Sequence, residues 1–167
     1  MFKKITRIFC IAAIVNLSVI ITVRGQEAQQ KFDKKIFYSA MASEDVDAIN
    51  NELAIIHSNS IEGKDAFEGV LLMKKADLVG NKKEKLNLFK SGKAKLEGVI
   101  AKDSTNAEFR FFRLQIQEHA PKFLKYHDEL ENDRQYIRKA FKGLPADVQQ
   151  VIMDYSKKSK ILHSTDF

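Results

Sequence analysis

The stretch that decides the fold is NKKEKLNLFKSGKAKLEGVIAKDSTNAEFRFFRLQIQEHAPKFLKY, residues 81–126. It predicts two helices joined by a tight corner. Asn81, with a glutamate three residues later, is typical of a capped helix start, and Thr105 repeats this capping-box pattern for the second helix. Pro121 has no backbone N–H and clashes with the preceding turn, so it ends the second helix.

The first helix of this pair has one apolar face with a glycine on it. Residues three and four apart share a face of a helix, and the apolar ones here are Leu86, Phe89, Leu96, Val99 and Ile100. Gly92 lies on the same face. A glycine inside a helix costs about 1 kcal/mol relative to alanine, so Gly92 predicts a close crossing with another helix.

The second helix is apolar on two sides. Phe109, Phe112 and Ile116 fall on one side of the helix, whereas Phe111 and Leu114 fall nearly opposite. A helix that is apolar on two sides is buried on two sides. We therefore expect all five of these side chains to be buried and this helix to be the central one.

A polar strip separates the two apolar sides, and it is the candidate binding site: Asn106, Arg110, Arg113 and Gln117. In the functional interpretation it grips an anionic group or a partner's C-terminus, as concave helical surfaces do. In the structural interpretation the arginines pair with carboxylates beyond the turn, and for Arg113 the candidates are Asp128, Glu131 and Asp133. We favour the structural interpretation, because buried polar groups are normally satisfied internally.

The rest of the chain also predicts helices and no strand, because no stretch alternates apolar and polar residues with β-branched enrichment. The expected helices span Glu27–Met41, a segment capped by Ser43, Asp65–Val79, a segment capped by Asp128, and a last segment after Pro145. Gly80 joins the third helix to the fourth in a tight antiparallel hairpin. We expect one all-α domain over residues 26–167, with short antiparallel helices packed on the central pair.

The N-terminus is typical of a signal peptide. It has a basic start, a 16-residue apolar run over residues 8–23, and small residues at Val23 and Gly25 for the cleavage site. We expect residues 1–25 to be removed, so that the mature chain begins at Gln26. A retained anchor is the alternative, but a membrane span needs about 20 apolar residues.

Removal of this segment changes the charge of the protein. The full chain has 28 Lys and Arg against 22 Asp and Glu, and residues 1–25 hold four of the basic residues and none of the acidic ones. The mature chain therefore has 24 basic against 22 acidic residues, a net charge of only +2. This balance gives no argument for nucleic acid binding.

The sequence carries no pattern of an enzyme or a metal site. Cys10 is the single cysteine and falls in the signal peptide, which excludes a disulfide, a zinc–thiolate site and a cysteine nucleophile. His127 and Glu131 are four apart, but no second ligand pair, glycine-rich phosphate loop or nucleophile elbow accompanies them. We expect no catalytic residue, no metal site and no cofactor.

Two resemblances add to this interpretation. The hairpin at Gly80, with Phe89 and Gly92 in its second helix and DSTNAE (103–108) as a junction, loosely resembles a tetratricopeptide repeat. This resemblance implies a bundle or solenoid of stacked helices, although the tryptophan, the Leu-Gly pair and the junction proline of that repeat are missing.

A second resemblance covers most of the mature chain. The segments AFEGVLLMKKADLV, KLNLFKSGKAKLEGVI, NAEFRFFRLQIQEHAPKFLKY and IMDYSKKSKIL are similar to a group of uncharacterised secreted proteins of Gram-negative bacteria. The resemblance implies an exported helical domain, periplasmic or extracellular, and supplies no catalytic residue.

Two functions follow as hypotheses. The first is a helical module that binds a protein or peptide, with no nucleic acid partner and no stable membrane span after cleavage. The alternative is a helical carrier with an internal pocket for a small or lipidic ligand, suggested by the many phenylalanines. A large buried cavity would favour the carrier, whereas a tightly packed core with an open concave face would favour the module.

Overall fold

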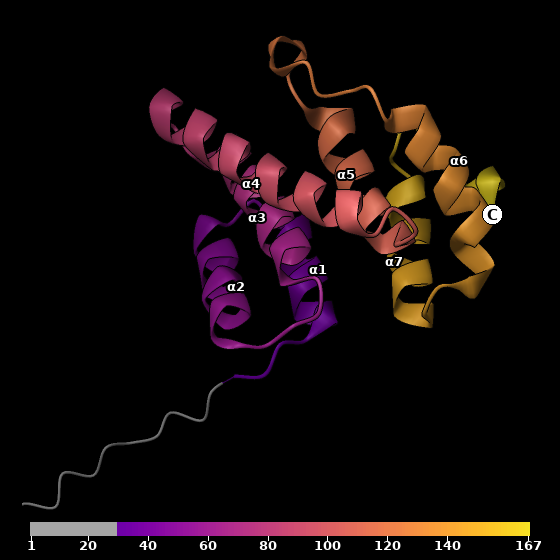
Figure 1. Cartoon of the computed structure of the whole chain (residues 1–167), viewed down its shortest axis with the longest axis horizontal. Helices are drawn as coiled ribbons and strands as arrows, with labels where there is room; N and C mark the ends of the chain where they lie inside the picture. Colours follow the sequence, from indigo (N-terminus) through magenta and orange to yellow (C-terminus); the bar gives the residue numbers. More distant parts are fainter. Residues whose placement is uncertain (1–29) are drawn as a thin grey trace, which may run out of the picture.

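Seven α-helices and three short 3-10 turns make up the part of the chain that the computed structural model describes, residues 30–167 (Figure 1). The helices are α1 (Lys34–Ala42), α2 (Val46–Ser58), α3 (Lys64–Leu78), α4 (Lys82–Lys102), α5 (Ala107–His119), α6 (Leu130–Ala140) and α7 (Ala146–Ser156). No strand occurs in this range, which confirms the all-α prediction. The predicted signal peptide, residues 1–25, lies outside the described residues.

Polar side chains at four N-termini explain where those helices begin. The first N–H groups of a helix have no partner within it, and a capping side chain supplies one. The caps are Asp33, Asp45, Asn81 and Asn106. The prediction for Asn81 is confirmed, because its side-chain oxygen accepts hydrogen bonds from the N–H groups of Lys83 and Glu84 at 3.0 and 3.1 Å.

Three other predicted starts are wrong by one or two residues. Ser43 closes the end of α1, and the cap of the next helix is two residues further on. Thr105 donates hydrogen bonds from both its N–H and its hydroxyl to Asp103, and Asn106 is the N-cap of the helix instead. Helix α6 begins two residues after Asp128 and has no side-chain cap. Short polar residues near a helix start compete for the cap role, and the pattern alone does not rank them.

Helix α1 begins later than predicted. The expected span was Glu27–Met41, but the cap Asp33 sets the start, and residues 27–29 lie outside the described range. Phe32 precedes the helix, yet its ring still packs against Phe67 with a centroid distance of 5.2 Å. Ile36 in the first turn of this helix is 45% exposed.

Helices α3 and α4 form an antiparallel hairpin that crosses at two glycines. A Cβ atom on Gly92 would overlap the carbonyl oxygen of Gly69, and one on Gly69 would come within 2.7 Å of the Gly92 carbonyl oxygen. The close crossing predicted from Gly92 is thus confirmed. Lys95 of α4 also reaches Asp65 of α3, with 2.8 Å between Nζ and Oδ1. Leu86, predicted on the buried face of α4, is instead 40% exposed.

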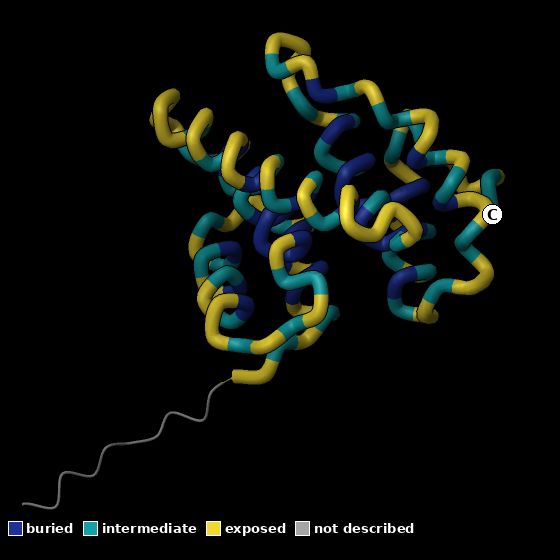
Figure 2. Tube along the Cα trace, viewed as in Figure 1, coloured by how far each residue is buried: buried dark blue, intermediate teal, exposed yellow. Residues whose placement is uncertain are grey.

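Helix α5 is buried on two sides, as its pattern predicts (Figure 2). Phe112 meets the rings of Phe37 from α1 and Phe67 from α3 at centroid distances of 5.5 and 5.4 Å. On the opposite side Phe111 packs against Tyr155 of α7 at 5.5 Å. This helix therefore joins the N-terminal helices to the C-terminal ones.

The chain after α5 returns along the molecule. Pro121 follows the end of α5 as predicted, and a 3-10 turn spans Lys122–Leu124. Two more 3-10 turns follow α6 and precede the C-terminus, at Phe141–Gly143 and Ser164–Asp166. Ile116, near the end of α5, is only half-buried, whereas Leu162 is fully buried although it lies beyond α7.

Candidate functional site

Asn106, the first residue of the predicted strip, is the N-cap of α5. Its side-chain oxygen accepts hydrogen bonds from the N–H groups of Glu108 and Phe109 at 3.0 and 3.2 Å. These bonds satisfy two of the groups that a helix start leaves open. The side chain of Asn106 therefore serves the fold.

Arg113 and Asp133 form a buried ion pair between α5 and α6. Nε of Arg113 donates to one carboxylate oxygen of Asp133, and Nη2 donates to the other, both at 2.7 Å. Asp133 is fully buried and Arg113 is 6% exposed. This two-pronged geometry is the strongest that arginine makes with a carboxylate. The predicted pairing of Arg113 with an acidic residue after Pro121 is confirmed, and Asp133 is the partner.

Glu97 of α4 extends this pair into a network. It accepts a hydrogen bond from Arg113 Nη1 at 3.0 Å and another from the hydroxyl of Tyr126 at 2.5 Å. Burial by itself lowers the pKa of Arg113, but the hydrogen bonds and charges of Asp133 and Glu97 raise it above its usual range. Burial and the neighbouring Glu97 both raise the pKa of Tyr126. The arginine is thus held charged and the tyrosine neutral.

Arg110 and Gln117 also have partners inside the molecule. Arg110 donates from Nη1 to Asp133 at 2.9 Å and from Nε to the Ser104 carbonyl at 2.7 Å, and its guanidinium lies 4.3 Å from the ring centroid of Tyr136. Gln117 accepts a hydrogen bond from the N–H of Glu129 at 3.2 Å. All four strip residues thus hold parts of the fold together.

We call Arg110, Arg113 and Asp133 the α5–α6 clamp. Two arginines on one carboxylate leave the buried charge of Asp133 fully hydrogen-bonded, which a buried ion requires. The contacts agree with the structural interpretation of the strip. A binding role for Asn106, Arg110, Arg113 and Gln117 stays a prediction, and these internal contacts do not require it.

Two further carboxylates on α5 tie distant segments together, and no pattern in the sequence indicates either role. Glu108 accepts hydrogen bonds from the Tyr38 hydroxyl at 2.6 Å and from Lys34 Nζ at 2.7 Å. Glu118 accepts from the Tyr155 hydroxyl and the Ser159 hydroxyl at 2.6 Å, and from a backbone N–H at 2.5 Å. Their partners lie 37 to 74 residues away in the sequence, so no local spacing signals these contacts.

Glu52 of α2 has a buried carboxyl group. It is 2% exposed, and Oε1 has no hydrogen bond within residues 30–167. Burial, with a smaller contribution from the charge of Asp33, raises the pKa of Glu52. A protonated carboxyl is the form that such surroundings favour.

The histidine and glutamate that the sequence placed at ligand spacing both have ordinary partners. A ring nitrogen of His127 lies 2.8 Å from the Ala120 carbonyl oxygen, and Glu131 accepts a hydrogen bond from Gln135 at 2.9 Å. Within residues 30–167 no three side chains of the metal-binding types gather at one place. In the same range no helix is long and apolar enough to span a membrane.

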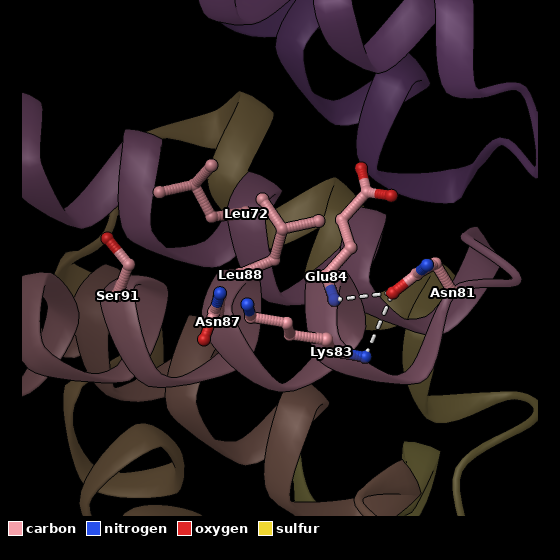
Figure 3. A pocket seen from close by; sticks show the side chains of 7 residues that line it. All are labelled: Leu72, Asn81, Lys83, Glu84, Asn87, Leu88 and Ser91. Atoms are coloured by element: carbon pink, nitrogen blue, oxygen red, sulfur yellow. Dashed lines mark hydrogen bonds between the residues drawn. The ribbon is translucent and has the colours of Figure 1, made fainter.

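An open hollow lies between α3 and the first half of α4 (Figure 3). Its volume is about 510 Å³, and its lining residues are Leu72, Asn81, Lys83, Glu84, Asn87, Leu88 and Ser91. Leu72 and Leu88 supply an apolar floor, and polar side chains surround it. The oxygen of Asn81 is occupied by the cap of α4. The polar side chains of the rim that stay open to a ligand are Lys83, Glu84, Asn87 and Ser91.

Comparison with other proteins adds no relative: no protein-family model, no curated protein and no solved structure matches this chain.

Proposed function

We propose that this protein is a helical binding module that recognises a protein or peptide, and that it has no catalytic role. The observation that carries the proposal is the open hollow between α3 and α4, which has an apolar floor and a polar rim. Small-molecule and peptide sites commonly combine these two features. Short connections between the consecutive helices α1 to α4 support the tetratricopeptide-like stacking on which such modules present a surface.

The phenylalanines favour the module over the alternative carrier. A carrier needs an internal space, and the aromatic residues that suggested one pack against each other instead. The ring of Phe67 lies 5.0, 6.0 and 5.4 Å from the rings of Phe37, Phe109 and Phe112. Edge-to-face contacts at these distances are typical of a filled aromatic core.

The hollow suits a short peptide with an apolar side chain. Such a side chain would pack on Leu72 of α3 and Leu88 of α4, which lie next to each other in the hollow. Asn87 and Ser91 would then bond to the peptide backbone, because both present polar side chains at the rim. Export to the periplasm or beyond, which the pattern of residues 1–25 supports, is part of the proposal and would set where the partner is met.

A peptide selection tests the proposal. A displayed library of random peptides is passed over the immobilised protein, and the retained sequences are compared for wild type and two variants. Ser91→Arg places a long charged side chain at the rim and should abolish retention. Ala101→Arg adds the same side chain at an exposed position near the other end of the same helix, so it should retain the peptides that wild type retains.

Two results would contradict the module. One is the absence of any enriched peptide with wild type. The other is an equal loss or an equal retention of peptides with Ser91→Arg and Ala101→Arg. A small molecule carried through purification and seen in the mass of the intact folded protein would instead favour the carrier.

A further inference from the structure

The 3-10 turn after α5 presents an exposed aromatic side chain between two lysines. Phe123 is 78% exposed, far more than any other large apolar residue that the structure describes. Lys122 and Lys125 flank it and are exposed as well. Lys125 has φ 48°, a left-handed conformation that turns the chain sharply at this point.

Tyr126 fixes this turn against α4. Its ring packs edge-on against Phe89 at 5.7 Å, and the ammonium group of Lys93 lies 4.5 Å from its centroid. Its hydroxyl donates to Glu97. Residues 89, 93 and 97 are one helical turn apart, so the turn sits over one face of α4.

The same face continues toward the start of α4. Lys82, Leu86 and Lys90 follow the three- and four-residue spacing that leads to Phe89 and Lys93. Leu86 is half-exposed, and Lys82 and Lys90 are exposed. Figure 2 shows the first half of α4, at upper left, and the turn after α5, at the top, as two largely exposed projections on the same side of the molecule.

We call these six residues the basic–aromatic surface: Lys82, Leu86 and Lys90 of α4 with Lys122, Phe123 and Lys125 of the turn. Its four lysines form no ion pair with any residue in the described range. It includes no carboxylate. Glu97, the nearest acidic residue on this face, is engaged by Arg113 and Tyr126. The surface therefore carries uncompensated positive charge around exposed apolar groups.

The shape of this surface favours a membrane over a protein. Phe123 does not line the hollow between α3 and α4, and its ring is exposed between two lysines. A lipid interface needs no complementary hollow. It takes up aromatic rings at the headgroup level and attracts lysines when the lipids are anionic.

We propose that the basic–aromatic surface docks the protein on membranes that contain anionic lipids. Phe123 enters the headgroup region, Leu86 contacts it beside the ring, and the four lysines meet the lipid phosphates. This docking is peripheral and reversible. It is independent of the peptide hollow, which lies on the α3 side of α4.

A single tryptophan provides a direct test, because the chain contains none. In the full chain, Phe123→Trp places the probe on the turn, and Ile36→Trp places a matched probe at a half-exposed position on α1. Vesicles of phosphatidylglycerol and phosphatidylcholine should shift the emission of the probe at 123 to the blue and expose it to quenching by brominated lipid. Vesicles of phosphatidylcholine alone should do neither, and the probe at 36 should not respond.

The lysines supply the second part of the test. Lys122→Gln with Lys125→Gln, in the Phe123→Trp background, should weaken vesicle binding about 30-fold, since each lysine near an anionic surface contributes roughly fivefold. The shift should also disappear at high salt. Residues 1–29 are identical in every variant, so any affinity that they supply cancels in the comparison.

Three results would overturn membrane docking. The first is a probe at 123 that does not respond to anionic vesicles. The second is an equal response of the probes at 123 and 36, or of anionic and neutral vesicles. The third is a response to poly-glutamate without a response to vesicles, which would assign the surface to acidic proteins. Circular dichroism of each variant confirms beforehand that the fold is kept.

Discussion

Asp133 is fully buried and accepts hydrogen bonds from two arginines of α5. Removal of a carboxylate from water is costly, and such donors must replace its hydration. The clamp can therefore be close to neutral for stability when it is complete, yet loss of one partner is severe. Its role is to fix how α6 docks on α5.

We predict that Arg113→Met lowers the free energy of unfolding by about 3–5 kcal/mol, the range for removal of one partner of a buried pair. Methionine keeps an apolar chain but leaves Asp133 with only Arg110. Urea denaturation measures the loss. Arg138→Met is the matched control, because Arg138 is nearly half exposed in its ion pair with Asp166, and exposed pairs contribute about 0–1 kcal/mol.

A double-mutant cycle then decides between the two interpretations of the strip. If Arg113 and Asp133 act as a clamp, Asp133→Asn should cost little more once Arg113→Met is present. Additive losses of unfolding free energy from the two substitutions would contradict the clamp. The strip would then be the leading candidate for a binding site.

At this scale the sequence predicted contacts only where the partner was close along the chain. Arg113 and its three acidic candidates are 15 to 20 residues apart, and the reversal at Pro121 brought them together. The roles of Glu108 and Glu118 were out of reach, because their partners come from segments whose packing no local pattern encodes. Thr105 was misread because Asp103, two residues earlier, competes for its hydroxyl.

The packing of the α3–α4 hairpin depends on the absence of a side chain at two positions, Gly69 and Gly92. At the crossing, the backbones of Gly69 and Gly92 approach so closely that neither position has room for a Cβ atom. The obstacle in each case is backbone, which cannot rotate away. The helices would have to separate along their shared face.

We predict opposite signs for two glycine substitutions in α4. Gly92→Ala should destabilise the protein by about 1–3 kcal/mol, the usual cost of forced overpacking. Gly98→Ala should stabilise it by about 0.5–1 kcal/mol, because nothing lies near its Cβ position and alanine favours the helix. Thermal unfolding of both variants measures the two effects, and a gain with Gly92→Ala would show that the crossing is looser than described.

At the scale of elements, the periodicity of apolar residues predicted well which helices exist and which of their faces are buried. The reason is that spacing in a helix determines which side chains share a side. Periodicity failed to predict burial where the burial of a residue depends on how far the neighbouring helix extends. Leu86 has the spacing of a core residue, yet it is 40% exposed because α4 projects beyond its cover (Figure 1). A sequence pattern does not encode where the covering helix ends.

Glu118 of α5 holds the C-terminal segment against the rest of the molecule, because it accepts hydrogen bonds from Tyr155 of α7 and from Ser159 beyond it. Burial raises the pKa of Glu118, but the hydrogen bonds from Ser159 and Tyr155 lower it more, so the net shift is downward. A carboxyl with a lowered folded-state pKa stabilises the fold above its ordinary pKa. That contribution is lost as the pH falls through the folded value.

We predict that Glu118→Gln destabilises the protein at pH 7 by about 1–2 kcal/mol, toward the low end for hydrogen bonds to a charged group because the site is half-buried. The difference from wild type should shrink as the pH falls below the ordinary range of a glutamate. Urea denaturation at a series of pH values measures it. Glu131→Gln, at an exposed position, is the control and should change little, and a pH-independent loss would contradict the assignment.

At this largest scale, the all-α class followed from the absence of alternating strands, and the central place of α5 followed from its two apolar sides. The docking of the segment after α7 did not follow. Leu162 lies in the irregular segment beyond α7, yet it is fully buried. An irregular segment is positioned by individual contacts, such as the hydrogen bonds of Glu118. Such contacts do not recur at a regular spacing in the sequence, so no pattern predicts them.

The link between α1 and Glu108 also bears on the order in which the chain folds as it is made. Tyr38 and Lys34 are 70 and 74 residues ahead of their partner, and ribosomes add about 5–20 residues per second. Helix α1 has nine residues, too short to persist alone in water. It therefore waits about 4–15 seconds after its synthesis for α5, and we expect a protease to cut at Lys34 and Lys35 in nascent chains stalled before residue 108. Protection of these sites in such chains would show that α1 folds without α5.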